Sequence, residues 1–306
     1  MDLRQLRYFL GVVEHGSIAK AADELHVAQS AISLHLHRLE NELGCMLVHR
    51  TSRGIVPTEP GMRLASRARA ILTDVGTIAE EVRGIEAAPE GKVVVGMPTS
   101  LGIALTVPLA MVVRRQYPLI RLRIAEGLSG HMLQWLASGQ LDLALVFGVE
   151  NNTGITKELL GKEHLNLVGA EGMDAMAEAG PISQSDVFGL PLILPGHPHG
   201  LREEVERAAS RHGRKLNVLL EIDSLENIKA LVAERIGYTV LSSRVAEYGL
   251  FSSRLRYRQI SDSRIERSIY LARPSSTPLT MAASRVMTAL SKTFTDWHHS
   301  SSGEPF

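Results

Sequence analysis

Seven apolar residues between positions 64 and 85 are separated alternately by four and three residues, the heptad spacing of a helix that packs along one narrow stripe. They are Leu64, Ala68, Ile71, Val75, Ile78, Val82 and Ile85. A helix from Thr58 to Ile85 would be roughly 42 Å long. A partner helix is the natural cover for so narrow a stripe, so the segment predicts a dimerisation helix. The alternative is a helix that packs on its own domain.

The preceding segment has the pattern of two short helices joined by a tight turn at 26–28. Ser17 is a good N-cap for the first helix, and the small residues Ala21 and Ala22 allow the two helices to approach closely. The apolar residues of the second helix fall on one face: Ile32, Leu36, Leu39 and Leu43. This pattern predicts a helix-turn-helix whose second helix lies in a major groove. The alternative is an ordinary helical hairpin with a polar face.

The outward face of the second helix carries short, hydrogen-bonding side chains where a merely solvated face would carry Glu and Lys. Gln29 and Ser30 lie at the helix N-terminus, where backbone N–H groups bind phosphate and a Gln side chain reaches a base edge. The candidate DNA-binding residues of this helix are Gln29, Ser30, Ser33, Leu34, His37 and Arg38.

The segment 46–58 has two short extended pieces around a Ser-Arg-Gly sequence, which predicts a small hairpin with basic residues near its tip. Arg50 and Arg53 would then lie near the DNA backbone and supply affinity that is independent of sequence and falls with salt. Simple solvation is the alternative for any single surface arginine.

Composition does not by itself indicate nucleic acid, because 33 Lys and Arg balance 33 Asp and Glu. The single cysteine, Cys45, excludes an internal disulfide framework, and the 12 histidines show no metal-ligand spacing. We expect no metal or cofactor. Because the chain contains no phosphate-binding glycine loop, no Gly-x-Ser-x-Gly motif and no paired acid and base, we expect it not to be an enzyme.

The N-terminus lacks the pattern of a signal peptide, and no apolar run reaches membrane-spanning length. We therefore expect a cytoplasmic protein that does not associate with membranes.

Strand and helix patterns alternate after a Pro/Gly boundary near residue 89, which predicts α/β lobes with a mostly parallel sheet. A strand at 267–273 and a helix at about 279–294 would return to the first lobe. The expected domains are a winged helix-turn-helix at 1–58, a linker helix at 59–88, and a two-lobed regulatory domain at 89–306, with lobe 1 at about 89–162 and 268–295, lobe 2 at about 163–267 and a disordered tail at 296–306.

Ligands in such α/β domains bind beyond the carboxyl ends of strands, where helix N-termini point. Thr99 and Ser100 follow a strand and begin a helix, so they could hold an anion or a carboxylate; helix capping is the alternative. The other residues at strand ends are Ser129, Phe147, His197 and His199. Together these residues predict a site for a small anionic effector.

The segments LRQLRYFLGVVEHGSIAKAADELHVAQSAISLHLHRLENELG and HRTSRGIVPTEPG resemble the DNA-binding region of the LysR-type transcriptional regulators, including its linker helix. The resemblance is close over residues 1 to about 88, and the remaining chain follows the family's domain order. It implies that Gln29, Ser30 and Ser33 face the major groove and that Arg50 and Arg53 form the wing. The sequence departs from the family at Leu34, where a basic or polar residue is usual, and at Ala28, where Ser or Thr is common.

The resemblance further implies a periplasmic-binding-protein-like regulatory domain, effector contacts at Thr99 and Ser129, and a dimer of dimers. Double-stranded DNA, further copies of the chain and RNA polymerase are the expected partners. The stretch LILPGHPHGLR resembles the nitrogen-assimilation-control branch, whose members need not respond to a small effector. Control by abundance or by a protein partner is therefore the alternative. A solute receptor for transport would share the two lobes but would need an export signal and no winged helix.

Overall fold

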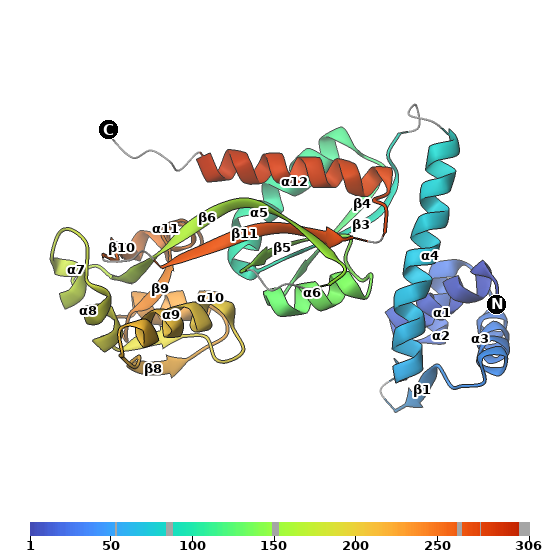
Figure 1. Cartoon of the computed structure of the whole chain (residues 1–306), viewed down its shortest axis with the longest axis horizontal. Coiled ribbons are helices and arrows are strands. Elements are labelled where there is room, and N and C mark those ends of the chain that lie inside the picture. The colour runs from blue at the N-terminus through green and yellow to red at the C-terminus, as the bar shows by residue number, and fades with distance from the viewer. Residues whose placement is uncertain (53, 84–87, 149–152, 262–264, 276, 300–306) are drawn as a thin grey trace.

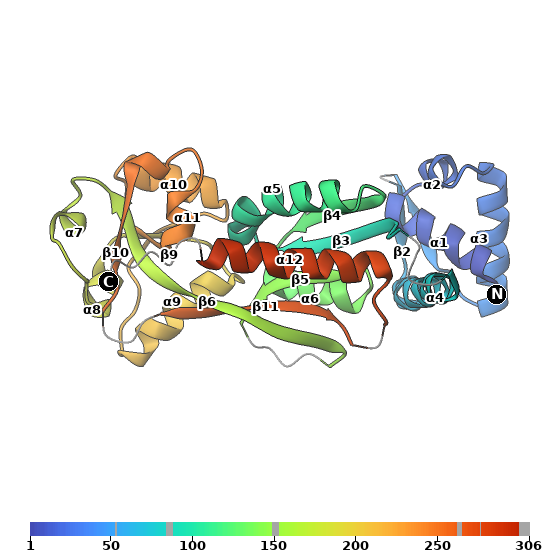
Figure 2. The ribbon, with the colours of Figure 1, turned by 90° about the horizontal axis from the view of Figure 1, so that it is seen from above.

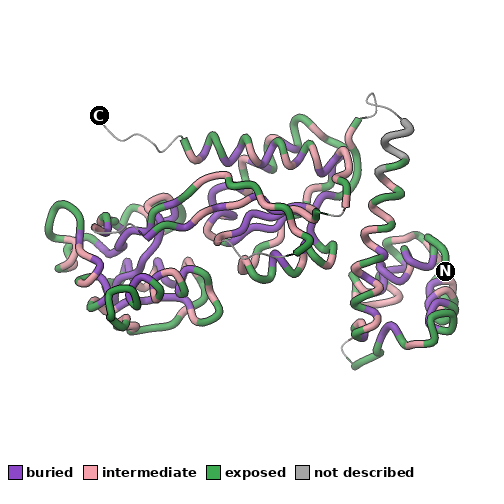
Figure 3. The backbone as a smooth tube through the Cα atoms, viewed as in Figure 1, coloured by how far each residue is buried: buried purple, intermediate pink, exposed green. Residues whose placement is uncertain are grey.

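The computed structural model describes all residues except 53, 84–87, 149–152, 262–264, 276 and 300–306. Figure 1 shows an N-terminal helical domain with a long helix beside it, followed by two α/β lobes along the longest axis of the molecule. Figure 3 shows that buried residues are concentrated in the sheets of the lobes and in the helical domain. None of the helices in the described part of the chain combines the length and the hydropathy needed to cross a membrane.

The N-terminal domain consists of three helices and a hairpin: α1 (Leu3–His15), α2 (Ile18–Leu25), α3 (Gln29–Leu43), β1 (Val48–Thr51) and β2 (Gly54–Pro57). Ser17 caps α2 by accepting a hydrogen bond from the Lys20 N–H, as its position predicts. Gly44 ends α3 in the left-handed conformation. Ala21 and Ala22 are buried against Ile32, so the small side chains do bring α2 and α3 together.

One residue of the apolar face expected for α3 does not reach the core. Ile32, Leu36 and Leu39 are buried, but Leu43 is 41% exposed. At this end of α3 the inward position is taken by Glu40, whose Oε1 accepts a hydrogen bond from the Leu47 N–H at 2.8 Å. The buried carboxylate thus satisfies the backbone entering β1, and Leu43 remains on the surface.

The heptad stripe lies on helix α4 (Glu59–Arg83), and its two ends have different surroundings. Ala68 is fully buried in the core of its own domain, and Leu64 packs against that core. Because α1 covers this end of the helix, Ala68 has no surface left for a partner chain, whereas Leu64 is half-buried. Further along, Ile71, Val75 and Ile78 are exposed. Val82 and Ile85 lie outside the residues whose side chains the structure describes.

Lobe 1 is a sheet covered by helices on both faces. Its elements are β3 (Gly91–Met97), α5 (Thr99–Gln116), β4 (Ile120–Glu126), α6 (Ser129–Ala137), β5 (Leu143–Phe147) and α12 (Met281–His299). Figures 1 and 2 show α5 and α12 on one face and α6 on the other. Successive residues of β3 point to opposite faces of the sheet. Val93 and Val95 pack under α5 and α12, whereas Val94 packs against α6.

Lobe 2 has its own hydrophobic core, with residues between Leu165 and Ile265. Its elements are α7 (Asp174–Ala177), α8 (Gln184–Gly189), β7 (Leu192–Leu194), α9 (Gly200–Arg211), β8 (Val218–Glu221), α10 (Leu225–Ala233), β9 (Thr239–Ser242), α11 (Ser243–Glu247), the 3-10 turn η1 (Ser252–Arg254) and β10 (Leu255–Gln259).

Two strands connect the lobes, β6 (Ile155–Ala170) and β11 (Glu266–Pro274). The main sheet has the order β10-β6-β11-β5-β3-β4, with β9 also paired to β6. Only β3, β4 and β5 are parallel to one another in it, so the expectation of a mostly parallel sheet is wrong. The reason is the connection: the chain leaves lobe 1 along β6 and returns along β11, and the two strands therefore pair antiparallel.

The last helix is longer than the sequence predicts. Residues 296–299 belong to α12, and Trp297 is buried beneath the guanidinium group of Arg244, which lies 4.9 Å from the centre of the indole ring. Arg244 also donates a hydrogen bond to the His298 carbonyl oxygen. The disordered tail therefore does not begin at 296, because lobe 2 holds the end of α12 in place. Residues 300–306 lie outside the described part.

Candidate DNA-binding surface and interlobe cavity

The outward face of α3 carries the residues that the sequence predicts. Gln29, Ser30, Leu34, His37 and Arg38 are exposed, and Ser33 is half-buried. The helix begins after Ala28, which provides no side-chain cap. The N–H groups of Gln29 and Ser30 make no hydrogen bond with any described residue, so they are available to a phosphate.

The hairpin β1–β2 is held close to the start of α2. The Ile55 N–H donates a hydrogen bond to the Gly16 carbonyl oxygen at 2.8 Å, and Gly54 approaches the same backbone too closely to carry a side chain. Arg50 is exposed on β1 opposite Ile55. Arg53 lies outside the described residues. The hairpin thus presents at least one basic residue beside the helix-turn-helix.

A cavity of about 210 Å³ lies between the two lobes. Five of the predicted effector residues line it together: Thr99, Ser100, Ser129, Phe147 and His199. Helices α5, α6, α9 and α10 all begin at or next to its lining. Because the N-terminus of a helix carries partial positive charge, these four helix ends make the cavity favourable for an anion.

The hydroxyl groups in the cavity differ in their hydrogen bonding. The N-cap of α5 is Pro98, and the hydroxyls of Thr99 and Ser100 make no hydrogen bond with a described residue. The capping alternative therefore does not account for them. Ser129 Oγ accepts a hydrogen bond from the Phe147 N–H at 3.0 Å, which joins the start of α6 to the end of β5. Its hydroxyl proton remains available to a ligand.

Sequence analysis missed the most polar group of the cavity, Arg267. Its side chain is buried, its guanidinium carbon lies 3.9 Å from the centre of the Phe147 ring, and its Nε donates to Glu163 Oε1 at 2.9 Å. Arg267 and Glu163 are directly opposite each other on β11 and β6. A charged residue at the start of an apolar strand was the only signal in the sequence, and its partner follows only from the strand register.

The two histidines of the loop before α9 have different surroundings. His199 caps α9, with its Nδ1 accepting from the Leu201 N–H at 3.1 Å. Burial lowers the pKa of His199, and the charge of Arg267 lowers it further. His197 does not line the cavity, and its Nε2 lies 3.2 Å from Glu206 Oε2. The structure therefore places His199 at the cavity and His197 outside it, since the loop turns the two side chains to different sides.

These observations define a class: a DNA-binding protein whose winged helix-turn-helix is connected by a long helix to a two-lobed α/β domain. Residues 3–62 match the family model "Bacterial regulatory helix-turn-helix protein, lysR family", and residues 86–295 match "LysR substrate binding domain". The chain therefore belongs to the LysR family of DNA-binding transcriptional regulators. Members of this family regulate transcription, and the chain is not an enzyme.

Two curated relatives share the name nitrogen assimilation regulatory protein nac. The chain is 32% identical over 248 residues to the protein of Escherichia coli (strain K12), covering 80% of each, and 30% identical over 294 residues to that of Klebsiella aerogenes, covering 95% of each. It is also 28% identical over 243 residues to the hydrogen peroxide-inducible genes activator of Dickeya chrysanthemi, covering 79% of each.

Solved structures share the fold along nearly the whole chain. A cysteine variant of full-length OxyR from Pseudomonas aeruginosa superposes with a TM-score of 0.81 at 22% identity, covering 96% of this chain and 94% of that one. Full-length CbnR complexed with its target DNA superposes with a TM-score of 0.57 at 20% identity, covering 96% of this chain and 100% of that one.

Proposed function

We propose that this regulator binds its operator through α3 and the β1–β2 hairpin and responds to a small carboxylate, or a similar anion, in the interlobe cavity. The observation that carries the effector proposal is the convergence of four helix N-termini and Arg267 on one cavity with two unpaired hydroxyls. The only acidic residue among those lining the cavity is Asp223, whose Oδ1 accepts from the Gly196 N–H at 3.1 Å. The cavity lies below the range of roughly 300–1,000 Å³ that suits drug-sized ligands, which favours a small metabolite.

Helix α6 offers a direct connection from this cavity to the N-terminal domain. It begins at Ser129 in the cavity and ends at Ala137 beside α4. Ser66 of α4 donates to the Ala137 carbonyl oxygen at 3.2 Å, and Arg69 donates to that of Ser138 at 3.1 Å. A ligand that moves the start of α6 would therefore change the support of α4. An effector acts only if it binds one arrangement more tightly than the other.

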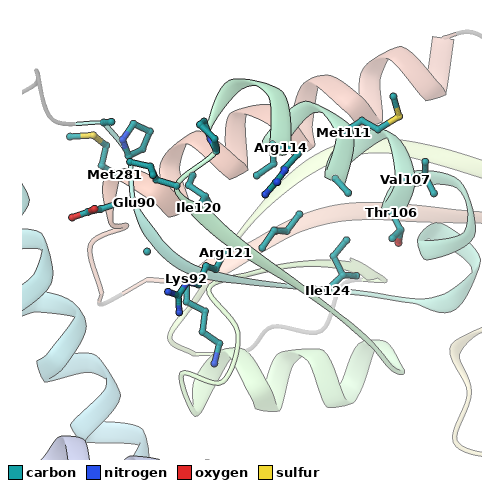
Figure 4. Close-up of a pocket in the computed structure, with 18 of the residues that line it drawn as sticks. Glu90, Lys92, Thr106, Val107, Met111, Arg114, Ile120, Arg121, Ile124 and Met281 are labelled. Carbon is teal, nitrogen blue, oxygen red and sulfur yellow. The ribbon is translucent and has the colours of Figure 1, made fainter. Parts of the chain in front are cut away.

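Two separate surfaces support assembly into a dimer of dimers. One is the exposed part of the α4 stripe. The other is a groove of about 1490 Å³ between α5 and β4, the last strand of the main sheet. Figure 4 shows Val107 and Met111 of α5 and Ile124 of β4 along this groove, with Arg121 nearby. Val107 and Met111 are exposed, and two distinct apolar surfaces are what a tetramer of identical chains requires.

The similarity to the nac proteins favours a second candidate, a regulator controlled by its abundance or by a protein partner such as RNA polymerase. In that case the cavity would hold no effector. A peroxide response through a pair of cysteines is not proposed for this chain, because its single cysteine, Cys45, lies in the N-terminal domain.

Thr99→Val together with Ser129→Ala is expected to weaken effector binding by about 1 to 3 kcal/mol, because it removes two hydroxyls and leaves the backbone N–H groups in place. Calorimetry of the full chain against a panel of small carboxylates measures this loss. Thr295→Val, which removes a hydroxyl on α12 that bonds within its own helix, is the control. If no carboxylate binds the wild-type chain and none changes its footprint on DNA, the effector proposal is wrong and the second candidate is favoured.

Gln29→Ala and Arg50→Ala separate recognition of sequence from attraction to the backbone. Gln29→Ala is expected to cost roughly 1 to 3 kcal/mol at the operator and little on random DNA. Arg50→Ala should weaken binding to the operator and to random DNA alike. It should also reduce the slope of log K against log salt concentration by about one unit. Fluorescence anisotropy at several salt concentrations measures both effects. Equal losses for the two variants on both DNAs would contradict these roles.

A further inference from the structure

Leu34 is an exposed leucine in the first half of α3, and its side chain has no hydrogen-bonding group. Its side chain is 49% exposed, and it belongs to neither hydrophobic cluster of the N-terminal domain. The apolar residues that do hold α3 in place, such as Ile32 and Leu36, are buried on the opposite face. Leu34 is therefore not part of the hydrophobic core of the N-terminal domain.

Leu34 lies within the face that we propose for base recognition. Ser30 is one turn before it and His37 and Arg38 are one turn after it, and all three are exposed. The position is in the first half of α3, the half of a recognition helix that contacts base edges. Polar neighbours on both sides show that Leu34 is a single apolar side chain in a hydrogen-bonding surface.

The chemistry of the major groove leaves few partners for such a side chain. Base edges present hydrogen-bond donors and acceptors there, and a leucine that covers them removes water without replacing its hydrogen bonds, which costs free energy. The apolar group that a base pair offers in the major groove is the 5-methyl group of thymine. Contact between that methyl group and Leu34 would remove apolar surface from water on both partners.

We propose that Leu34 recognises a thymine of the operator through its 5-methyl group, and so specifies a T·A pair in each half-site. The proposal rests on the proposed role of α3 as the recognition helix. It adds that a hydrophobic contact carries part of the specificity, and it names the base.

The experiment first selects duplexes from a random library with the full chain and identifies the thymines common to the bound sequences. Each such thymine is then replaced with deoxyuridine, which removes only the methyl group. Loss of one buried methyl group is expected to weaken wild-type binding about fourfold in each half-site. One thymine position should show this effect, and fluorescence anisotropy at constant salt measures it.

Leu34→Ala is expected to bind the thymine and deoxyuridine duplexes equally well, because the side chain that contacts the methyl group is gone. Leu43→Ala is the matched control: it is also an exposed leucine of α3, but it lies at the far end of the helix. This control should retain the full sensitivity to deoxyuridine. Unchanged affinity of both variants for random DNA shows that the domain remains folded.

The outcomes separate this inference from the proposed function. If the wild-type chain selects no common sequence, the proposed role of α3 fails. If it selects a sequence that is insensitive to deoxyuridine at every thymine, or if Leu34→Ala remains as sensitive as wild type, the inference about Leu34 is overturned. A Leu34→Ala variant that binds DNA as wild type does but loses transcriptional activation would assign Leu34 to a protein contact instead.

Discussion

Val75→Glu together with Ile78→Glu is expected to convert the dimer that we propose to form through α4 into a monomer and to abolish specific DNA binding. Both residues are exposed on the part of α4 beyond the core of the N-terminal domain. In a dimer, each pair of glutamates would be buried against the same pair of the partner without a compensating cation. An uncompensated buried charge costs about 3 to 5 kcal/mol, which weakens association roughly a thousandfold.

Sedimentation of the segment 1–88 measures this change directly, because the segment contains the complete hydrophobic core of the N-terminal domain. Specific binding by the full chain should fall as well, since two recognition helices must be held about one DNA turn apart to read both half-sites. Met62→Glu is the control, since Met62 is an exposed apolar residue of α4 that lies off the stripe. An unchanged dimer with both glutamates present would show that α4 does not mediate association.

Arg267→Met is expected to destabilise the regulatory domain by about 3 to 5 kcal/mol, because it leaves the carboxylate of Glu163 buried without its cation. Both side chains are almost completely buried, and Glu163 Oε2 already has no hydrogen-bond partner among the described residues. Denaturant unfolding followed by tryptophan fluorescence reports this change, because both tryptophans of the chain, Trp135 and Trp297, lie in lobe 1.

The double variant Glu163→Gln with Arg267→Met tests the reason for that loss. Removing both charges also removes the uncompensated one, so most of the stability should return. The double variant also separates stability from effector binding. If Arg267→Met and the double variant both bind carboxylates more weakly than wild type, and the double variant unfolds like wild type, Arg267 acts on the effector directly. If Arg267→Met unfolds like wild type, the buried pair contributes nothing to the fold of the regulatory domain.

The order and type of the helices in the N-terminal domain follow from local signals in the sequence. Ser17 as a cap, Gly44 as a helix end and the apolar spacing of α3 act within one or two turns, so they are visible without knowledge of the fold. The same holds for the strand ends that place Thr99 and Ser129 at helix starts. The LysR motif in the first 88 residues then indicated the function of these elements together.

Contacts between distant parts of the chain determine the features that local signals in the sequence do not show. The heptad stripe of α4 has one period along its whole length, but its first part is covered by α1, and only the tertiary structure distinguishes Ala68 from Val75. The pairing of Arg267 with Glu163 depends on the register of two strands that are far apart in sequence. His197 and His199 are equivalent in the sequence pattern, and the path of their loop separates them. Periodicity specifies which face of a helix or strand is apolar. Which segment covers that face depends on how distant parts of the chain pack together.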